Sequence, residues 1–136
     1  MEVQPYLFFD GRCQEAIDFY QEALNAEVVM RMSFKDSPVP TSQPPAFADK
    51  IMHACLRIGE TQMFMSDGMC AGAPSFQGFT LSVSLKDDAE AERVFAALGA
   101  GGTVTMPMAR TFFASTFGMV TDRFGMGWMV LVQTPV

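Results

Sequence analysis

The side chain with the widest chemical range in this sequence is His53, the only histidine among 136 residues. It lies within an apolar stretch, Met52 to Leu56, that predicts a strand. One histidine cannot supply the several imidazoles that most catalytic zinc and iron sites use. Two interpretations stay open: a structural histidine held by a hydrogen bond, or an imidazole that faces a pocket and binds an anion or acts as an acid or base.

Arg31 is a second polar side chain set between apolar neighbours on a predicted strand. Its guanidinium can pair with a ligand carboxylate or emerge at a solvated edge, and the sequence leaves both open. Gly99-Ala100-Gly101-Gly102 is not typical of a phosphate loop, because it follows a predicted helix and precedes a strand, the reverse of the order required. The sequence contains no GxSxG nucleophile motif and no dinucleotide or S-adenosylmethionine fingerprint.

Methionine and phenylalanine are abundant, with 12 and 13 residues. Several methionines recur two positions apart, which is the spacing of one face of a strand. These pairs are Met30 with Met32, Met63 with Met65, and Met106 with Met108. Thioethers and phenyl rings fill ordinary cores, and they also line pockets that adapt to irregular apolar ligands.

Two copies of one pattern must position these residues: a short apolar strand, a capped amphipathic helix and a return strand, at 6–28 and 81–104. Ala16 in the first helix and Ala91 in the second are 75 positions apart (91 − 16), and so are Tyr6 and Leu81 (81 − 6). The pattern predicts a duplication. Two helix-backed sheets can curve around a ligand, so the functional surface is expected on the sheet faces away from the helices.

In the first copy, the sequence predicts a strand at 6–9, a helix that opens at Gln14-Glu15 and ends at Asn25, and a strand at 27–34. Alternation in the last strand places Val28, Met30 and Met32 on one side and Val29 and Arg31 on the other. Four prolines between Lys35 and Lys50 predict a long excursion, either a plain surface loop or a flap over a pocket. Residues 51–58 and 61–66 are typical of a hairpin with Gly59-Glu60 in a type II′ turn.

In the second copy, Asp87 or Asp88 is expected to cap a helix that ends at Gly99. Strands are predicted at 103–108, 111–114, 117–121 and 128–133, with a turn at Asp122-Arg123-Phe124-Gly125. The fold class is therefore α+β, with two units of one strand, one helix and three strands. We assign residues 1–136 to a single domain, with module 1 at about 4–67, a linker at about 68–77 and module 2 at about 78–134.

Composition narrows the function classes. Hydrophobic residues make up 49% and charged residues 18%, which favours a globular chain, and no apolar run approaches the ~20 residues of a membrane helix. The formal charge of −6 argues against nucleic acid or an anionic membrane as partner. Three widely spaced cysteines are typical of reduced thiols, and no secretion signal is evident, so we expect a cytoplasmic protein.

Several motifs follow one another between Pro5 and about Val132. They are Asp10-Gly11, Ala16, Phe19-Tyr20, Met52-His53-Ala54, Met106-Pro107, and Asp122-Arg123-Phe124-Gly125 through Trp128-Met129-Val130. In this order they resemble the PhnB-like (YjdN-like) branch of the vicinal oxygen chelate superfamily, which includes glyoxalase I, bleomycin-resistance proteins and extradiol dioxygenases. The most specific parts are the Met-His-Ala strand and the closing Asp-x-Phe-Gly-x-x-Trp-Met segment.

The resemblance implies paired βαβββ modules that form a cupped eight-stranded mixed sheet with helices on the outer face, and usually a homodimer. In metal-using relatives, His, Glu or Gln ligands come from the first and last strands of each module. That scheme points here to Gln4 or Pro5, Met63 or Met65, Phe79 or Thr80, and Met129. These side chains offer at most an amide, a hydroxyl and thioethers, whereas hard or borderline divalent ions prefer imidazole and carboxylate. We therefore expect no metal and no cofactor.

The branch that this sequence resembles has also been described as a demethylubiquinone methyltransferase and linked to phosphonate use. Methyl transfer requires a donor site and phosphonate binding requires clustered Arg or Lys, and the sequence shows neither. The position of Phe113 holds Trp in many sequences that the branch includes, so the surroundings of Phe113 are expected to differ.

We predict a cytoplasmic, dimeric, metal-independent protein that binds a small apolar or aromatic molecule in a cleft lined by Met and Phe and partly closed by the 35–50 excursion. The candidate ligand-binding residues are His53, Arg31, Met63, Met65, Phe79, Phe113 and Met129. The alternative is a metal-dependent lyase, isomerase or dioxygenase of the same superfamily that uses His53. A third possibility is an interaction module whose cupped face is filled by its own side chains. The sequence does not decide whether the protein turns a substrate over.

Overall fold

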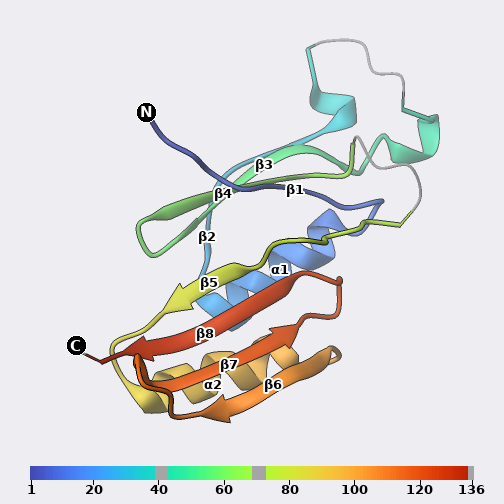
Figure 1. Cartoon of the computed structure of the whole chain (residues 1–136). Coiled ribbons are helices and arrows are strands. Elements are labelled where there is room, and N and C mark those ends of the chain that lie inside the picture. Colours follow the sequence, from blue (N-terminus) through green and yellow to red (C-terminus); the bar gives the residue numbers. More distant parts are fainter. Residues whose placement is uncertain (39–42, 69–72, 135–136) are drawn as a thin grey trace. The chain divides into compact units, whose positions relative to one another are not determined.

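Each half of the chain folds as one strand, one helix and three further strands (Figure 1). The computed structural model describes residues 1–38, 43–68 and 73–134. Two compact units, Met1–Pro74 and Ser75–Val136, are called modules 1 and 2 below. Module 1 contains β1 (Tyr6–Phe8), α1 (Cys13–Leu24), β2 (Glu27–Ser33), β3 (Ile51–Ile58), β4 (Thr61–Ser66) and two short 3₁₀ turns, Phe34–Asp36 and Pro45–Phe47. Module 2 contains β5 (Leu81–Ser84), α2 (Asp88–Gly99), β6 (Thr103–Ala109), β7 (Ala114–Thr121) and β8 (Gly127–Gln133).

The two sheets have the same topology. Their strand orders are β1-β4-β3-β2 and β5-β8-β7-β6, so the first strand of each module lies beside its last. The β1–β4 and β5–β8 pairs are parallel and the other pairs are antiparallel. The predicted α+β class with two βαβββ modules is confirmed, and hydrogen bonding divides the described strands into two four-stranded mixed sheets.

The two helices confirm the duplication. α1 spans Cys13–Leu24 and α2 spans Asp88–Gly99, so both bounds differ by 75 positions (88 − 13 and 99 − 24). Asn25 ends α1 in the left-handed conformation with φ of 53°, which an asparagine tolerates. Asp87 caps α2, because its side chain accepts from the backbone N–H groups of Ala89 and Glu90.

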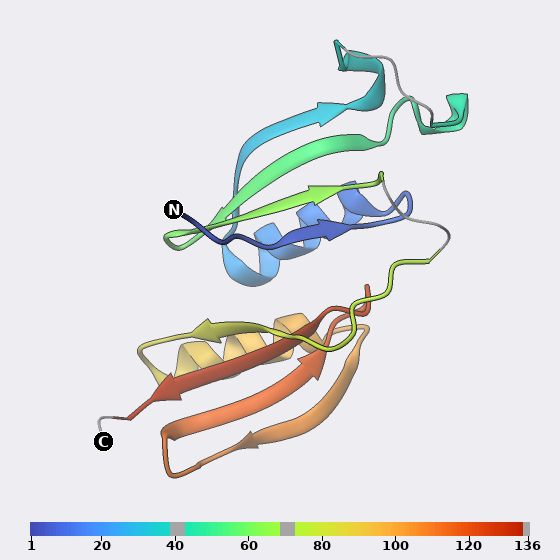
Figure 2. The same cartoon turned by 45° about the horizontal axis from the view of Figure 1, so that its top comes forward.

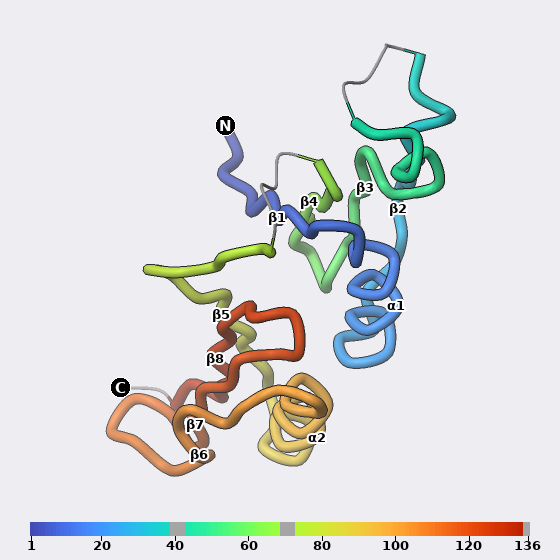
Figure 3. Tube along the Cα trace, turned by 90° about the vertical axis from the view of Figure 1, so that its right-hand side faces the viewer, coloured from blue at the N-terminus to red at the C-terminus, as the bar shows by residue number. Residues whose placement is uncertain are grey.

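Each helix lies along one face of the sheet of its own module (Figure 2; Figure 3 shows it from the side). In module 1 the strand register pairs Ala54 with Met65 and Leu56 with Met63, and all four side chains are buried. In module 2 the corresponding pairs are Val120 with Trp128 and Gly118 with Val130. A Cβ atom at Gly118 would lie 2.7 Å from the ring of Phe95 in α2, so glycine permits the close approach of helix and sheet.

Three local features differ from or refine the sequence predictions. A register shift between Val28 and Met30 places Val28 opposite Leu56 and Met30 opposite Cys55, on different faces, so the predicted shared side for these two residues is wrong. The strand predicted at 111–114 is also wrong, because Thr111 N–H donates to Ala114 O in a turn and β7 begins only at Ala114. The predicted II′ hairpin is confirmed, since Ile58 pairs with Thr61 and Gly59 has φ of 60°.

The excursion between β2 and β3 is held at its base. Phe34 N–H donates to Lys50 O, Lys35 N–H donates to Ala48 O, and Lys35 Nζ lies 2.7 Å from Asp49 Oδ1. Residues 39–42 lie outside the described part, so the predicted flap over a pocket stays a prediction.

Candidate functional site

The sheet of module 1 carries a ring-lined surface on the face opposite α1. Partners in the register share a face, so Tyr6 lies with Phe64, and Phe64 lies with Cys55. Phe8 and His53 follow by the two-residue alternation of β1 and β3. We call this surface the aromatic face, and it consists of Tyr6, Phe8, His53, Cys55 and Phe64.

The rings of the aromatic face contact one another in a connected cluster. The Tyr6 and Phe8 rings stack with centroids 4.9 Å apart, and the His53 and Phe64 rings stack at 5.6 Å. Tyr6 joins the two pairs, with centroids 5.5 Å from His53 and 5.8 Å from Phe64. Tyr6 remains 41% exposed, and His53 is intermediate between buried and exposed. The cluster thus offers a preformed surface of ring edges and faces to a planar ligand.

The polar part of the aromatic face is a hydrogen bond between the Tyr6 hydroxyl and His53 Nδ1, 2.7 Å apart. The Ser66 side chain lies close enough to the Tyr6 phenol to affect the pKa of that phenol, and Ser66 Oγ accepts from the backbone N–H of Gly68 at 2.9 Å. Burial raises the pKa of Tyr6 more than the Ser66 side chain lowers it, so the phenol stays protonated at neutral pH. The arrangement presents a neutral hydroxyl and an imidazole side by side.

The sheet of module 2 carries methionines on the corresponding face. Met106 lies opposite Met119 and Met119 lies opposite Met129, so three thioethers form a row across β6, β7 and β8. We call them the methionine row. Phe117, two residues before Met119, lies on the same face, and its ring is 5.3 Å from that of Phe113.

The structure distributes the predicted ligand-binding residues over several environments. His53 lies on the aromatic face, Met129 in the methionine row, and Phe113 beside Phe117. Phe79 precedes β5 and is half exposed. These four positions are consistent with contact to a ligand, and their role stays a prediction.

Three predicted residues lie on the helix side of module 1 instead. Met63 and Met65 are 1% and 0% exposed and share the helix-facing side with Leu56 and Ala54. Arg31 lies opposite Ala54, and its guanidinium hydrogen-bonds the Gln14 side chain of α1. A ligand on the aromatic face therefore meets none of these three side chains.

Tyr6, Phe8 and Phe64 were not among the predicted site residues. The predicted hairpin at Gly59-Glu60 could have identified Phe64. Pairing Ile58 with Thr61 places Cys55 opposite Phe64, so Phe64 shares a face with His53, and Met63 and Met65 lie on the other face. The two-residue spacing of Tyr6 and Phe8 on β1 was a second signal.

The open faces do not fit the metal ions used by the superfamily. On the first and last strands of the modules, these faces carry aromatic, hydroxyl, amide, thioether and aliphatic side chains. They are Tyr6, Phe8, Gln62, Phe64, Ser66, Ser82, Ser84, Met129, Leu131 and Gln133. Such donors do not provide the imidazole and carboxylate set that hard or borderline divalent ions prefer. Within residues 1–38, 43–68 and 73–134, no three His, Cys, Asp or Glu side chains are grouped as metal ligands.

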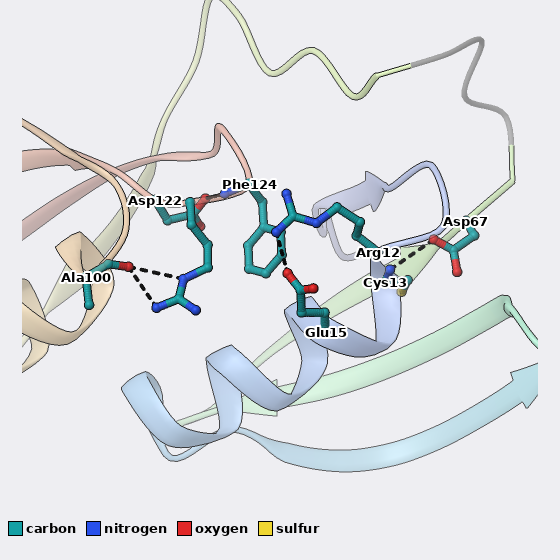
Figure 4. Close-up of polar contacts among 8 residues, drawn as sticks. Arg12, Cys13, Glu15, Asp67, Ala100, Asp122 and Phe124 are labelled. Atoms are coloured by element: carbon teal, nitrogen blue, oxygen red, sulfur yellow. Dashed lines mark hydrogen bonds and ion pairs between the residues drawn. The ribbon is translucent and has the colours of Figure 1, made fainter.

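Two buried aspartates hold the segments that carry the site. Asp67, 1% exposed, accepts from the backbone N–H groups of Gly11 (2.8 Å), Cys13 (3.0 Å) and Ile51 (3.0 Å), and thereby joins the start of α1 to the start of β3. Figure 4 shows the bond between Cys13 and Asp67. Burial, and next the Asp67 charge, raise the pKa of the Cys13 thiol. That thiol is therefore an inert core group rather than a nucleophile.

Asp122 organises the turn between β7 and β8. Its Oδ1 accepts from the backbone N–H groups of Phe124 (2.9 Å) and Met126 (3.0 Å), and its Oδ2 accepts from Trp128 Nε1 (2.9 Å). Figure 4 shows this carboxylate next to Phe124. The Asp-x-Phe-Gly-x-x-Trp motif is thus explained by the hydrogen-bonding needs of one turn.

Neither helix in the described part of the chain has the length and apolar character needed to cross a membrane.

Comparisons with known proteins assign the chain to one family. A family model described as 3-demethylubiquinone-9 3-methyltransferase matches residues 1–131. Protein YjdN of Escherichia coli K12 is 40% identical, over 97% of this chain and 95% of YjdN. The crystal structure of PA1353 from Pseudomonas aeruginosa, also 40% identical, covers 99% of both chains with a TM-score of 0.87. A glyoxylase/bleomycin resistance protein/dioxygenase domain from Frankia sp. EAN1pec, 14% identical, shares the fold with a TM-score of 0.65 over 98% of this chain and 93% of that domain. The chain belongs to the family described as 3-demethylubiquinone-9 3-methyltransferase, and it has the fold of the glyoxylase/bleomycin resistance protein/dioxygenase domain.

Proposed function

We propose that this chain is a small-molecule binding protein of the glyoxalase/bleomycin-resistance type, which takes an apolar or aromatic ligand without a bound metal ion. The observation that carries the proposal is the aromatic face of module 1. Its rings are connected, partly exposed, and set on a sheet whose other face is closed by α1. A rigid array of rings gives a planar ligand contact area at little cost in side-chain entropy.

The methionine row of module 2 is a second apolar surface whose chemistry suits an apolar ligand. Flexible thioethers adapt to irregular apolar shapes and make favourable contacts with aromatic rings. On the aromatic face, the nearest cation by strand register is Arg57, and its guanidinium pairs with Glu27 at 2.7 Å. This pairing favours a ligand whose contacts are mainly apolar.

Metal independence is supported by donor chemistry. The superfamily alternative, a metal-dependent lyase, isomerase or dioxygenase, would need several imidazole or carboxylate ligands, and His53 would have to supply one of them. Its Nδ1 already hydrogen-bonds Tyr6, and its neighbours on the face are rings, a thiol and the thioether of Met32. Metal analysis of protein purified without chelators is the check: stoichiometric zinc, iron, manganese or nickel would overturn metal independence and favour the enzyme.

A thermal unfolding experiment tests the binding proposal. Indole and acetophenone are expected to raise the melting temperature, whereas glycerol and glucose are not. A probe at about ten times its Kd adds about 1.4 kcal/mol to stability, which corresponds to a rise of about 4 °C for a chain of this size.

Matched variants locate the binding surface. Phe64→Leu removes a ring of the aromatic face, and Phe19→Leu removes a ring from α1. We expect the first variant to reduce the stabilisation by the aromatic probes to less than half and the second to leave it unchanged. Equal behaviour of the two variants, or no stabilisation of the wild type by either aromatic probe, would refute the proposal.

We also propose a cytoplasmic homodimer without nucleic-acid partners. The dimer is supported only by the family resemblance. Cys13 and Cys55 are free thiols, as expected in a reducing compartment, and the net charge of −6 disfavours binding to nucleic acid. Light scattering at several protein concentrations checks the dimer, and a monomeric mass throughout would reject it.

A further inference from the structure

The hydrogen bond between Tyr6 and His53 has a favoured direction. The backbone N–H of Gly68 donates to Ser66 Oγ at 2.9 Å, which leaves the Ser66 hydroxyl proton for another acceptor. Ser66 is 3% exposed, and its side chain lies close enough to the Tyr6 phenol to affect the pKa of that phenol. The Tyr6 hydroxyl lies 2.7 Å from His53 Nδ1. A phenol O–H is a stronger donor than a neutral imidazole N–H, and an imidazole nitrogen is a stronger acceptor than a phenol oxygen, so the favoured direction of this bond is from the Tyr6 hydroxyl to Nδ1.

This direction selects one tautomer of the imidazole. With the phenol as the donor, His53 Nδ1 is the acceptor of the bond to Tyr6. A neutral imidazole that accepts at Nδ1 carries its own proton on Nε2. In the described part of the structure, the imidazole makes no hydrogen bond other than the one to Tyr6. The outer nitrogen of the imidazole is therefore a donor, Nε2–H, on a face made of aromatic rings.

From this arrangement we propose that the ligand is a planar aromatic compound with a neutral carbonyl oxygen conjugated to its ring. The ring lies against the aromatic face and the carbonyl oxygen accepts from His53 Nε2–H. His53 is the binding residue, and Tyr6 is the positioning residue that fixes its tautomer. This inference rests on the proposed function and names the class of ligand for the same site.

A neutral acceptor fits better than a carboxylate. The nearest cation by strand register is Arg57, two positions along β3 from Cys55, and it is engaged by Glu27. Arg31 could pair with a carboxylate, but its guanidinium contacts Gln14 on the helix side of the sheet. An anion on the aromatic face would therefore lose hydration without gaining a paired charge.

Three probes of similar size test the inference by calorimetric or NMR titration of the full chain: acetophenone, ethylbenzene and benzoate. Ethylbenzene keeps the ring and lacks the acceptor, and benzoate carries a charged one. One hydrogen bond is worth about tenfold in affinity. We expect the wild type to bind acetophenone about tenfold more tightly than ethylbenzene, and to bind benzoate more weakly than acetophenone.

Isosteric variants of His53 make the test specific. The side-chain nitrogen of glutamine reaches the position of imidazole Nε2, and that of asparagine reaches the position of Nδ1. His53→Gln should keep most of the preference for acetophenone over ethylbenzene, whereas His53→Asn should lose it. If the two variants show the same preference, the assignment of Nε2–H as the donor is wrong.

Tyr6→Phe tests the positioning role separately. This variant keeps the ring and removes the hydroxyl, so the acetophenone preference should fall to about twofold. In protein labelled with ¹⁵N-histidine, the single imidazole should report protonated Nε2 in the wild type and a mixture of tautomers in Tyr6→Phe. A wild-type imidazole protonated at Nδ1, or an unchanged preference in Tyr6→Phe, would overturn the proposed role of Tyr6.

The possible failures are distinguishable. Equal affinity for acetophenone and ethylbenzene in the wild type would remove the carbonyl inference and leave the proposed binding function standing. Tighter binding of benzoate would replace the neutral acceptor by an anion and would also contradict the inference. If none of the three probes binds, the proposed function fails as well.

Discussion

Replacement of Asp122 by alanine is expected to lower the free energy of unfolding by about 3 to 5 kcal/mol. The carboxylate is 3% exposed and accepts hydrogen bonds from two backbone amides of its turn and from the Trp128 indole. Alanine removes this acceptor from three donors, each of which costs about 1 to 3 kcal/mol when it loses its partner in a buried site. Urea unfolding followed by fluorescence measures the loss.

Asp122→Asn is the matched control, since it preserves shape and one carbonyl oxygen. The asparagine oxygen can retain the bonds from the Phe124 and Met126 amides. Its amide nitrogen takes the place of Oδ2, so the Trp128 indole N–H loses its acceptor. We expect about half of the alanine effect. Trp128 is the single tryptophan, so its indole N–H resonance reports this bond in NMR spectra. An alanine variant that loses less than about 1 kcal/mol would show that the turn does not depend on this carboxylate.

Asp67→Asn should lower the free energy of unfolding by about 2 to 3 kcal/mol. Oδ1 accepts from the Gly11 and Cys13 amides and Oδ2 accepts from the Ile51 amide. In asparagine one oxygen becomes an N–H donor, so at least one backbone amide faces another donor inside the core. The start of α1 and the start of β3 should then exchange backbone hydrogens faster than the strands of module 2, which serve as the internal control.

Asp67 also predicts a pH dependence of stability. Burial raises its pKa above the ordinary value of 3.8, although three backbone hydrogen bonds and the charge of Lys50 act in the opposite direction. The folded state therefore binds this proton more tightly than the unfolded chain. The stability that Asp67 contributes is complete below pH 3.8 and declines as pH rises through the raised pKa.

The Asn variant lacks this titration, so the stability difference between wild type and Asp67→Asn should shrink as pH rises through the same window. The comparison isolates Asp67 because other acidic groups titrate alike in both proteins. A difference that grows with pH would mean that the pKa of Asp67 is lowered by its hydrogen bonds, contrary to the account.

The helices and the duplication could be predicted from the sequence because local signals specify them. The apolar spacing around Ala16 and Ala91, the cap at Asp87 and the end at Asn25 act within a few residues of one another, and the structure confirms each of them. The duplication followed from the same spacing, and the two modules accordingly have the same strand order.

The side assignments in module 1 failed where pairing between strands decides the outcome. The bulge between Val28 and Met30 reverses the alternation of β2, and nothing in the sequence of that strand alone marks it. Met63 and Met65 need not have been assigned to the same surface as His53. The predicted hairpin already placed them opposite Leu56 and Ala54, on the other face of the sheet. Strand alternation gives two faces, and only the register says which face the helix covers.

The contacts of Arg31 and Asp67 depend on tertiary structure. For Arg31 the sequence left open a ligand carboxylate or a solvated edge, and the structure places it exposed on the edge strand β2 with a hydrogen bond to Gln14 of α1. Asp67 follows β4 and is 1% exposed, because backbone amides distant in sequence require an acceptor. The sequence around an aspartate does not show which distant backbone amides will need it as an acceptor.

The most direct test of the central claim is an isotope-filtered NOE experiment on the full chain with acetophenone. His53 is the only histidine, so its ring protons give signals that require no separate assignment variant. The account predicts NOEs from the ligand ring protons to His53 together with the Tyr6 and Phe64 rings. NOEs confined to residues on α1, or no NOE to His53 under saturating ligand, would contradict it.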